Sequence, residues 1–167
     1  MNDEEIVYEY HRKGLTISTN PDLLDIDMIH AFVSNSYWAR GMPKDLVKKA
    51  IRYSFCFGLY EKSTQIGFAR LITDFTTEAE ICECFIVKHL QGRGLGTWLV
   101  ECVISCPALK GIRTLSLGTA DAHAFYKKLG FQVVGECPNR MQILYERPWF
   151  IRDSYQAACF GEDLEVI

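Results

Sequence analysis

The chain has 167 residues, a length typical of one domain with a sizeable core, and we expect a single domain over residues 1–167. Hydrophobic residues make up 49% of the sequence and charged residues 23%, which excludes a disordered chain. The formal net charge of -3 argues against a nucleic-acid partner, and no apolar run approaches the roughly 20 residues that cross a membrane.

The first half of the chain predicts two helices and then a β-hairpin. Apolar residues recur at helical spacing in residues 21–37 (PDLLDIDMIHAFVSNSY) and 43–54 (PKDLVKKAIRYS), and each stretch opens with a proline. Two short apolar runs follow at residues 54–60 (SFCFGLY) and 66–73 (IGFARLIT), separated by a polar turn. Such a pair is typical of two antiparallel strands.

The second half of the chain alternates between strand and helix patterns. The expected order is strand, helix, strand, helix, strand and strand, at residues 79–87, 94–106, 114–118, 121–130, 131–135 and 140–147. Together with the hairpin, this order predicts an α/β fold in which a mixed sheet carries helices on both faces. Residues 148–167 keep several aromatic side chains, so we expect this C-terminal extension to pack on the domain.

Residues 91–96 (QGRGLG) form a glycine-rich loop between a predicted strand and a predicted helix. Loops of this kind bind phosphate groups, because backbone N–H groups at a helix N-terminus converge on an anion. A P-loop is excluded, since GxxxxGK followed by Ser or Thr does not occur. A dinucleotide fingerprint fails because Thr97 stands at its third glycine position and residues 114–117 supply no acid. The remaining pattern, Gln-x-x-Gly-x-Gly, predicts a pyrophosphate site at residues 91–97.

Two stretches together resemble a known family. Residues 87–103 (VKHLQGRGLGTWLVECV) resemble the acyl-CoA pyrophosphate loop of the GNAT superfamily of N-acetyltransferases. Residues 117–135 (LGTADAHAFYKKLGFQVVG) resemble the family's strand–helix–strand segment, in which a tyrosine, here Tyr126, precedes a Lys-x-x-Gly-Phe-like ending. The resemblance is close over residues 55–134. It implies the GNAT-like acyl-CoA N-acyltransferase fold, a mostly antiparallel sheet whose fourth and fifth strands splay apart to admit the cofactor.

The resemblance implies acetyl-CoA as cosubstrate and a set of residues that contact it. These are Cys84, Phe85, Ile86, Val87, Gln91, Gly92, Arg93, Gly94, Leu95, Gly96, Thr97, Thr119 and Tyr126. Thr119 departs from the family, which often has an asparagine seven residues before the tyrosine. A hydroxyl group can make a similar contact with CoA.

Acetyl transfer to an amine requires a base for the amine proton and an acid for the departing thiolate. The resemblance assigns the acid to Tyr126, whose alternative role is ordinary aromatic packing. It assigns the base to Glu83, with Glu80 or a water chain as alternatives. His123 lies three residues before Tyr126 on the same helical face, and is either a proton relay or a structural residue. Cys84 raises the alternative of an acyl-cysteine, but no histidine is at hand to activate its thiol, so direct transfer in a ternary complex is expected.

The acceptor pocket is expected near residues 36–43 (SYWARGMP), with Tyr37, Trp38 and Arg40, although Trp38 and Arg40 could equally cover the edge of the core. The sequence leaves open whether the acceptor is a small amine, a peptide N-terminus or a lysine side chain, and whether the protein forms a homodimer. Two other functions stay open, a CoA-binding regulatory or scaffold module without turnover and, more remotely, a nicotinamide-binding protein.

The cysteines and the N-terminus bear on the cellular location. The seven cysteines form no CxxC pair, which argues against a structural zinc site, and most lie in apolar runs. Free, buried thiols of this kind are typical of a reducing compartment. The N-terminus MNDEEIVYEY is acidic where a secretory signal is basic and then apolar. We therefore expect a cytoplasmic enzyme that uses no metal.

Overall fold

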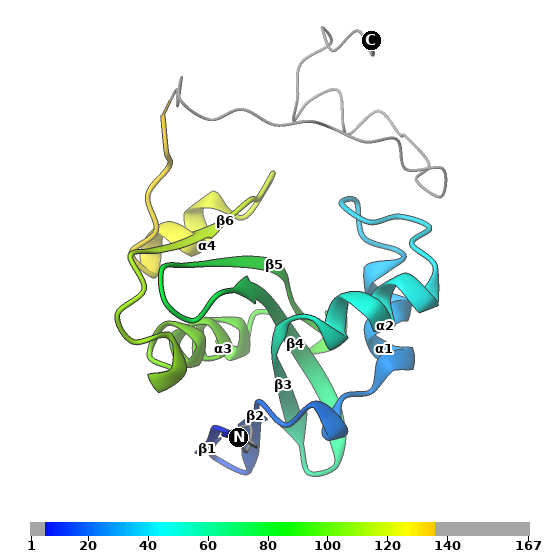
Figure 1. Ribbon diagram of the computed structural model, residues 1–167. Coiled ribbons are helices and arrows are strands. Elements are labelled where there is room, and N and C mark those ends of the chain that lie inside the picture. Colours follow the sequence, from blue (N-terminus) through cyan, green and yellow to red (C-terminus); the bar gives the residue numbers. More distant parts are fainter. Residues whose placement is uncertain (1–5, 136–167) are drawn as a thin grey trace, which may run out of the picture.

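The computed structural model describes residues 6–135 (Figure 1). Its strands are β1 Glu9–Arg12, β2 Leu15–Ser18, β3 Phe55–Glu61, β4 Thr64–Thr73, β5 Glu78–Ile86 and β6 Thr114–Leu117. Its α-helices are α1 Ile26–Val33, α2 Lys44–Arg52, α3 Leu95–Ile104 and α4 His123–Lys128. Short 3-10 turns occupy Pro21–Leu23, Lys88–Leu90 and Pro107–Leu109.

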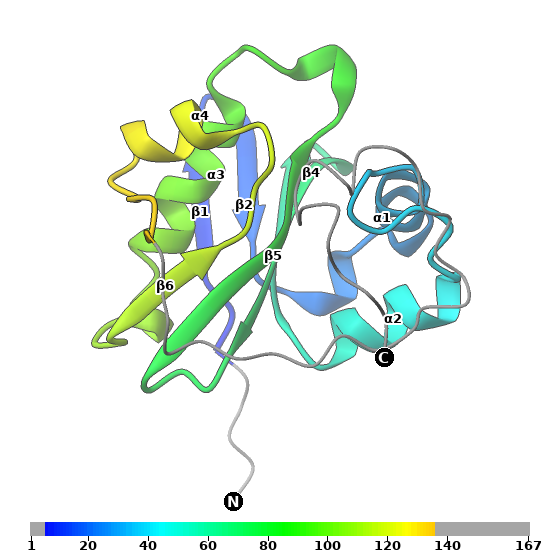
Figure 2. The ribbon, with the colours of Figure 1, turned by 90° about the horizontal axis from the view of Figure 1, so that it is seen from above.

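The strands form one six-stranded sheet in the order β1-β2-β3-β4-β5-β6. Each neighbouring pair is antiparallel except β5 and β6, which are parallel. A parallel pair requires a crossover connection, and α3 provides it. Figure 2 shows α1 and α2 on one side of the sheet and α3 and α4 on the other. The predicted α/β class, with a mixed sheet covered on both faces, is confirmed.

Each face of the sheet has its own apolar core. Under α3, the fully buried side chains of Phe57, Leu59 and Leu99 belong to the larger cluster. Under α1 and α2, Ile29 and Phe68 belong to the smaller one. The central strands therefore bury side chains on both faces, which explains why their sequences read as nearly continuous apolar runs rather than as strict alternation.

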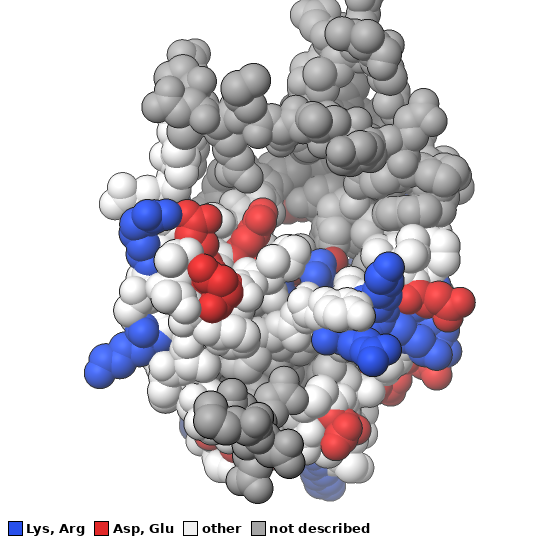
Figure 3. All heavy atoms as spheres, viewed as in Figure 1, with Lys and Arg blue, Asp and Glu red and all other residues white. Residues whose placement is uncertain are grey.

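The helix α2 is strongly amphipathic. Val47 and Ile51 are buried against the sheet, four residues apart and thus on one helical face. The opposite face carries exposed basic side chains, and Figure 3 shows Lys and Arg gathered over this helix. Elsewhere on the face in Figure 3 acidic and basic groups are interspersed.

The hairpin of β1 and β2 was not predicted from the sequence. Its two strands have four residues each and are joined by Lys13 and Gly14, both with positive φ (49° and 79°). Two successive residues of this kind are typical of the tight turns whose twist matches that of a β-hairpin. Because the strands are short and mostly polar, their apolar pattern is weak.

Two other predicted elements differ in the structure. Residues 21–37 do not form one helix; a 3-10 turn is followed by α1, whose N-cap Asp25 accepts a hydrogen bond from the Met28 N–H at 3.0 Å. The strand predicted at residues 131–135 is absent from this described part, where the Phe131 N–H bonds back to Tyr126 O at 3.2 Å and Val134 is exposed. The strand predicted at residues 140–147 and the extension 148–167 lie outside the described residues.

Leu99 provides a test of the packing of α3 on the sheet. Its side chain is fully buried, so Leu99→Ala removes apolar contacts and leaves a cavity. We expect the free energy of unfolding, measured by urea titration, to fall by about 2–5 kcal/mol. The control is Ile104→Ala on the same helix, where the side chain is 45% exposed and the loss should stay below about 1 kcal/mol. Equal losses in the two variants would contradict this packing.

Candidate functional site

The strands β5 and β6 pair over only part of their length. The ladder joins Glu78–Ile81 to Thr114–Leu117, whereas β5 continues to Ile86. Figure 2 shows the two strands close together at their N-terminal ends and apart at their C-terminal ends. On this side, the last residues of β5 have no partner strand within residues 6–135. Their main-chain groups are therefore available to a ligand that enters between the strands.

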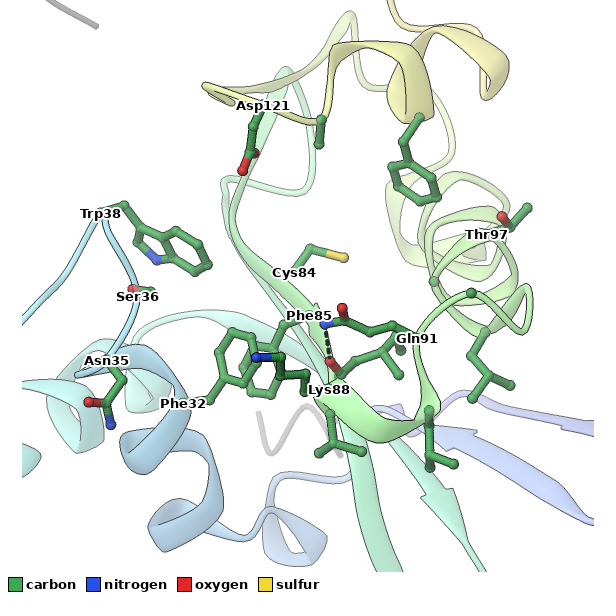
Figure 4. Close-up of a pocket in the computed structure, with 18 of the residues that line it drawn as sticks. Phe32, Asn35, Ser36, Trp38, Cys84, Phe85, Lys88, Gln91, Thr97 and Asp121 are labelled. Carbon is green, nitrogen blue, oxygen red and sulfur yellow. Dashed lines mark hydrogen bonds between the residues drawn. The ribbon is translucent and has the colours of Figure 1, made fainter. Parts of the chain in front are cut away.

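A cleft of about 1110 Å³ opens at this divergence (Figure 4). Residues from five segments line it: α1 with the loop that follows, the end of β5, the 3-10 turn Lys88–Leu90, the glycine loop with the start of α3, and α4 with the residues just before it. Most of the predicted cofactor residues are among them, namely Cys84, Phe85, Ile86, Val87, Gln91, Gly92, Gly94, Leu95, Gly96, Thr97 and Tyr126. Of the predicted set, Arg93 and Thr119 do not line the cleft.

The glycine loop places the start of α3 at the cleft. Gly92 and Gly94 have φ values of 76° and 74°, a conformation that residues with a Cβ rarely adopt. Gly94 is the N-cap of α3 and supplies no side-chain cap, and the first intrahelical bond joins the Trp98 N–H to Gly94 O at 3.1 Å. The N–H groups of residues 95–97, in the first turn of α3, have no acceptor within the helix. A helix start of this kind favours an anion.

Gln91 fixes this loop to the end of the strand. Its side-chain Nε2 donates a hydrogen bond to Ile86 O at 2.9 Å, drawn as a dashed line in Figure 4. The glutamine thus satisfies a strand carbonyl and holds the loop in place. Arg93 lies exposed in the same loop. Thr119 accepts a hydrogen bond from the Ala122 N–H at 3.0 Å, so its hydroxyl shapes the turn before α4.

Tyr126 lines the cleft on α4, next to Cys84 on β5. Burial raises the pKa of Tyr126 above its usual range, and the neighbouring Cys84, Tyr37 and Asp121 add to the effect. Burial also raises the pKa of Cys84 to about 11, although the Tyr126 hydroxyl offsets part of the shift. Both groups therefore hold their protons at neutral pH. A protonated phenol can act as an acid, whereas a protonated thiol is a poor nucleophile.

Glu83 is not among the residues that line the cleft. Its carboxylate forms an ion pair with Arg70, in which Nε and Nη2 both donate, the latter to Oε1 at 3.0 Å. Arg70 Nη1 also donates to Ser54 Oγ at 2.8 Å. Glu83 is 8% exposed and borders a small cavity beneath α1 and α2, on the other face of the sheet. Glu80, the alternative, is exposed and also lies outside the cleft lining.

A β-bulge underlies the position of Glu83. Arg70 pairs with Glu83 while the next residue, Leu71, pairs with Ile81, so Cys82 is the extra residue on β5. Ile81 and Cys84 both pack with the core under α3, although strict alternation would place residues three apart on opposite faces. Glu83 and Phe85 share the α1–α2 face.

The side of the cleft opposite the glycine loop is formed by α1 and the loop that follows it. Phe32 stacks on Phe85 with ring centroids 3.7 Å apart, and the Tyr37 ring meets Trp38 edge-on at 5.0 Å. The Tyr37 hydroxyl accepts a hydrogen bond from the Ala120 N–H at 3.1 Å, linking this loop to the segment before α4. Tyr37 and Trp38 both line the cleft, and their place in an acceptor pocket stays a prediction.

Two residues named from the sequence lie outside the cleft lining, and some residues that line the cleft were not predicted. Arg40 and His123 are exposed and do not line it. Lining residues that the sequence did not indicate include Phe32, Asn35 and Asp121. Phe32 lies on the predicted apolar face of its helix, but nothing local indicates that this face extends into a cleft.

Within residues 6–135, no group of three or more His, Cys, Asp and Glu side chains is arranged to hold a metal ion. No helix in the same residues combines the length and apolar character needed to cross a bilayer. Cys56, Cys102 and Cys106 are free and buried, as predicted.

Comparison with known proteins gives one consistent result. The family model described as acetyltransferase (GNAT) domain matches residues 52–133. A Gibberella zeae protein that carries the name of an acetyltransferase is 34% identical over 145 residues, covering 72% of this chain and 81% of the relative. An uncharacterized N-acetyltransferase of Gracilaria tenuistipitata var. liui is 38% identical over 101 residues, covering 56% of this chain and 54% of the relative.

Solved structures agree with these relatives. A crystal structure from Xanthomonas campestris pv. campestris, of a protein assigned to the GNAT family, superposes with a TM-score of 0.76 at 35% identity, covering 81% of this chain and 96% of the other. A GNAT-family acetyltransferase from Elizabethkingia anophelis with acetyl-CoA bound shares the fold, with a TM-score of 0.59 at 19% identity, covering 74% of this chain and 80% of the other. The chain therefore belongs to the GNAT family of acetyltransferases.

Proposed function

We propose that this protein transfers an acetyl group from acetyl-CoA to a primary amine by direct attack in a ternary complex. The observation that carries the proposal is a single cleft lined by the start of α3, the unpaired end of β5 and Tyr126. The start of α3 suits the pyrophosphate of the ligand, and the unpaired end of β5 suits its amide-bearing pantetheine arm. Tyr126 suits the departing thiolate. The acetyl-CoA bound to the Elizabethkingia anophelis neighbour supports the same ligand here.

The chemistry follows from the groups along the cleft. The lone pair of the amine nitrogen attacks the thioester carbonyl carbon, forming the N–C bond, and the C–S bond then breaks. Tyr126 donates its hydroxyl proton to the departing sulfur, and the nitrogen loses a proton to a base. The raised pKa of Cys84, to about 11, disfavours an acyl-cysteine intermediate and supports direct attack.

The decisive experiment measures thiol release from acetyl-CoA across a panel of amines, together with CoA binding by calorimetry. We expect release above the buffer rate with at least one amine. CoA binding without release for any amine would instead identify a regulatory or scaffold module. Stabilisation against heat by NAD and not by CoA would revive a nicotinamide-binding function.

Substitutions at Gly94 test whether the glycine loop binds the negatively charged pyrophosphate. A Cβ built there meets no atom within 4 Å, so a side chain has room, and Asp and Asn both tolerate its positive φ. We expect Gly94→Asp to bind CoA about tenfold more weakly than Gly94→Asn in calorimetry, because only the aspartate repels the pyrophosphate. Equal affinities in the two variants would mean that the pyrophosphate lies elsewhere.

Variants of Glu83 and Arg70 test whether the ion pair between them has a structural or a catalytic role. We propose that its role is structural. Glu83→Gln leaves the buried Arg70 charge without its partner, and we expect the free energy of unfolding to fall by about 3 kcal/mol in urea titration. The double variant Arg70→Met with Glu83→Leu removes both charges and should recover most of that loss. Its kcat should stay within about threefold of the wild type, since a base contributes 10²-fold or more. A stable double variant with a hundredfold lower kcat would restore Glu83 as the base.

A substitution at Tyr126 distinguishes acid catalysis by its hydroxyl from packing by its ring. Tyr126→Phe removes the hydroxyl and keeps the ring, so we expect kcat to fall by about 10²-fold while the KM for acetyl-CoA stays constant. Because the pKa of Tyr126 is raised, the hydroxyl stays protonated on the alkaline side, and the wild-type rate should not fall from its ionisation below about pH 10.

The matched control is Tyr53→Phe, at an exposed tyrosine outside the cleft. This variant should keep wild-type kcat. A Tyr126→Phe enzyme with wild-type kcat would reduce Tyr126 to a packing residue, and the acid would then be sought in water.

A further inference from the structure

We propose that Asp121 is the acceptor-binding carboxylate of the cleft, which holds the amino group of the acceptor before the thioester and receives a proton from it. This inference rests on the proposed function, since it assigns the acceptor side of the same site. It also supplies the base that neither Glu83 nor Glu80 provides from its position outside the cleft lining.

The first observation is the charge of the cleft. Among the described residues that line it, Asp121 is the single carboxylate and Lys88 the single basic side chain. Figure 4 shows the Asp121 side chain reaching into the space between Trp38 and Cys84, on the side away from Lys88 and the glycine loop. No salt bridge among residues 6–135 pairs Asp121 with a cation. A cationic group of the acceptor can therefore serve as its counter-ion.

The second observation is the proximity of Asp121 to the proposed acid. Its charge is one of the causes that raise the pKa of Tyr126, after burial and the neighbouring Cys84 and Tyr37. The carboxylate and the phenol therefore lie along the same part of the cleft. In acetyl transfer, the attacking nitrogen and the departing sulfur are bonded to one carbon, so the base and the acid must be near each other.

The third observation is that the main chain around Asp121 is held in place. The Ala120 N–H donates to the Tyr37 hydroxyl at 3.1 Å, and Thr119 Oγ1 accepts from the Ala122 N–H at 3.0 Å. The residues on both sides of Asp121 are thus fixed by hydrogen bonds. A positioned carboxylate binds an ammonium group through charge-assisted hydrogen bonds, which are stronger than neutral ones.

The acceptor nitrogen loses two protons when an ammonium group becomes a secondary amide. A primary amine with a pKa near 10.4 is mostly protonated at neutral pH, so Asp121 first binds the ammonium group, and one proton leaves to solvent before the attack. The neutral nitrogen attacks, becomes cationic as the N–C bond forms, and passes a second proton to Asp121. Tyr126 protonates the departing sulfur, and the products are the acetylated amine and CoA thiol. Both side chains then exchange protons with solvent.

The test compares Asp121→Asn with Asp45→Asn, an exposed aspartate on α2 that does not line the cleft. Two acceptors of similar shape are used, benzylamine, which is cationic at neutral pH, and aniline, which is not. We expect Asp121→Asn to lower kcat/KM for benzylamine by about 10- to 100-fold relative to its effect on aniline, the value of a charge-assisted hydrogen bond. The KM for acetyl-CoA should be unchanged, and Asp45→Asn should match the wild type.

The outcomes separate this inference from the proposed function. If Asp121→Asn leaves benzylamine turnover intact, or lowers the turnover of benzylamine and aniline equally, the inference is overturned while the proposed function stands. If the wild type turns over no amine, binding of benzylamine, spermidine and a lysine peptide to the CoA complex is measured by calorimetry. Binding that Asp121→Asn abolishes keeps the inference although the proposed function fails. Binding that is absent in the wild type, or unchanged in the variant, overturns the inference.

Discussion

The central constraint in this structure is the point at which β5 and β6 stop pairing. Four residues of β6 pair with β5, and β5 then continues alone to Ile86. Main-chain polar groups that are shielded from water require partners, and the end of β5 has none from a strand on this side within residues 6–135. The cleft, the exposed start of α3 and the approach of α4 all follow from this divergence.

The packing on both faces keeps that end of β5 rigid. Phe85 stacks on Phe32 beneath α1, whereas Ile86 packs with the core under α3. Gln91 ties the strand end to the glycine loop through its bond to Ile86 O. A ligand that pairs with this edge therefore meets main-chain groups that are already oriented, which lowers the ordering cost of binding. The apolar cores thus serve the site as well as the stability of the fold.

The sequence predicted the parts of the site that depend on local pattern. Tyr126 could be placed through the resemblance of residues 117–135 to the GNAT family, and the glycine loop could be placed because its spacing is contained in one strand–loop–helix segment. The same holds for the hairpin of β3 and β4. Asp121 could not be predicted in this way, because its place in the cleft depends on the turn before α4 and on contact with a loop far away in the sequence.

Other differences also have physical causes outside local pattern. The bulge at Cys82 shifts the register of β5, and sequence alternation cannot reveal such a shift. The partner of Glu83 is Arg70 on the adjacent strand, so the ion pair becomes visible only once the register is known. The β1–β2 hairpin pairs with β3 through β2 and buries Ile17 in the core under α3, and neither contact is visible in its short sequence pattern.

The hydrogen bond from Ala120 to Tyr37 joins residues 83 positions apart in the sequence. Closing a loop of this length costs conformational entropy, and contacts along the intervening chain reduce that cost. The bond links the loop after α1 to the segment that carries Asp121, so a substitution in one wall of the cleft can change the shape of the other.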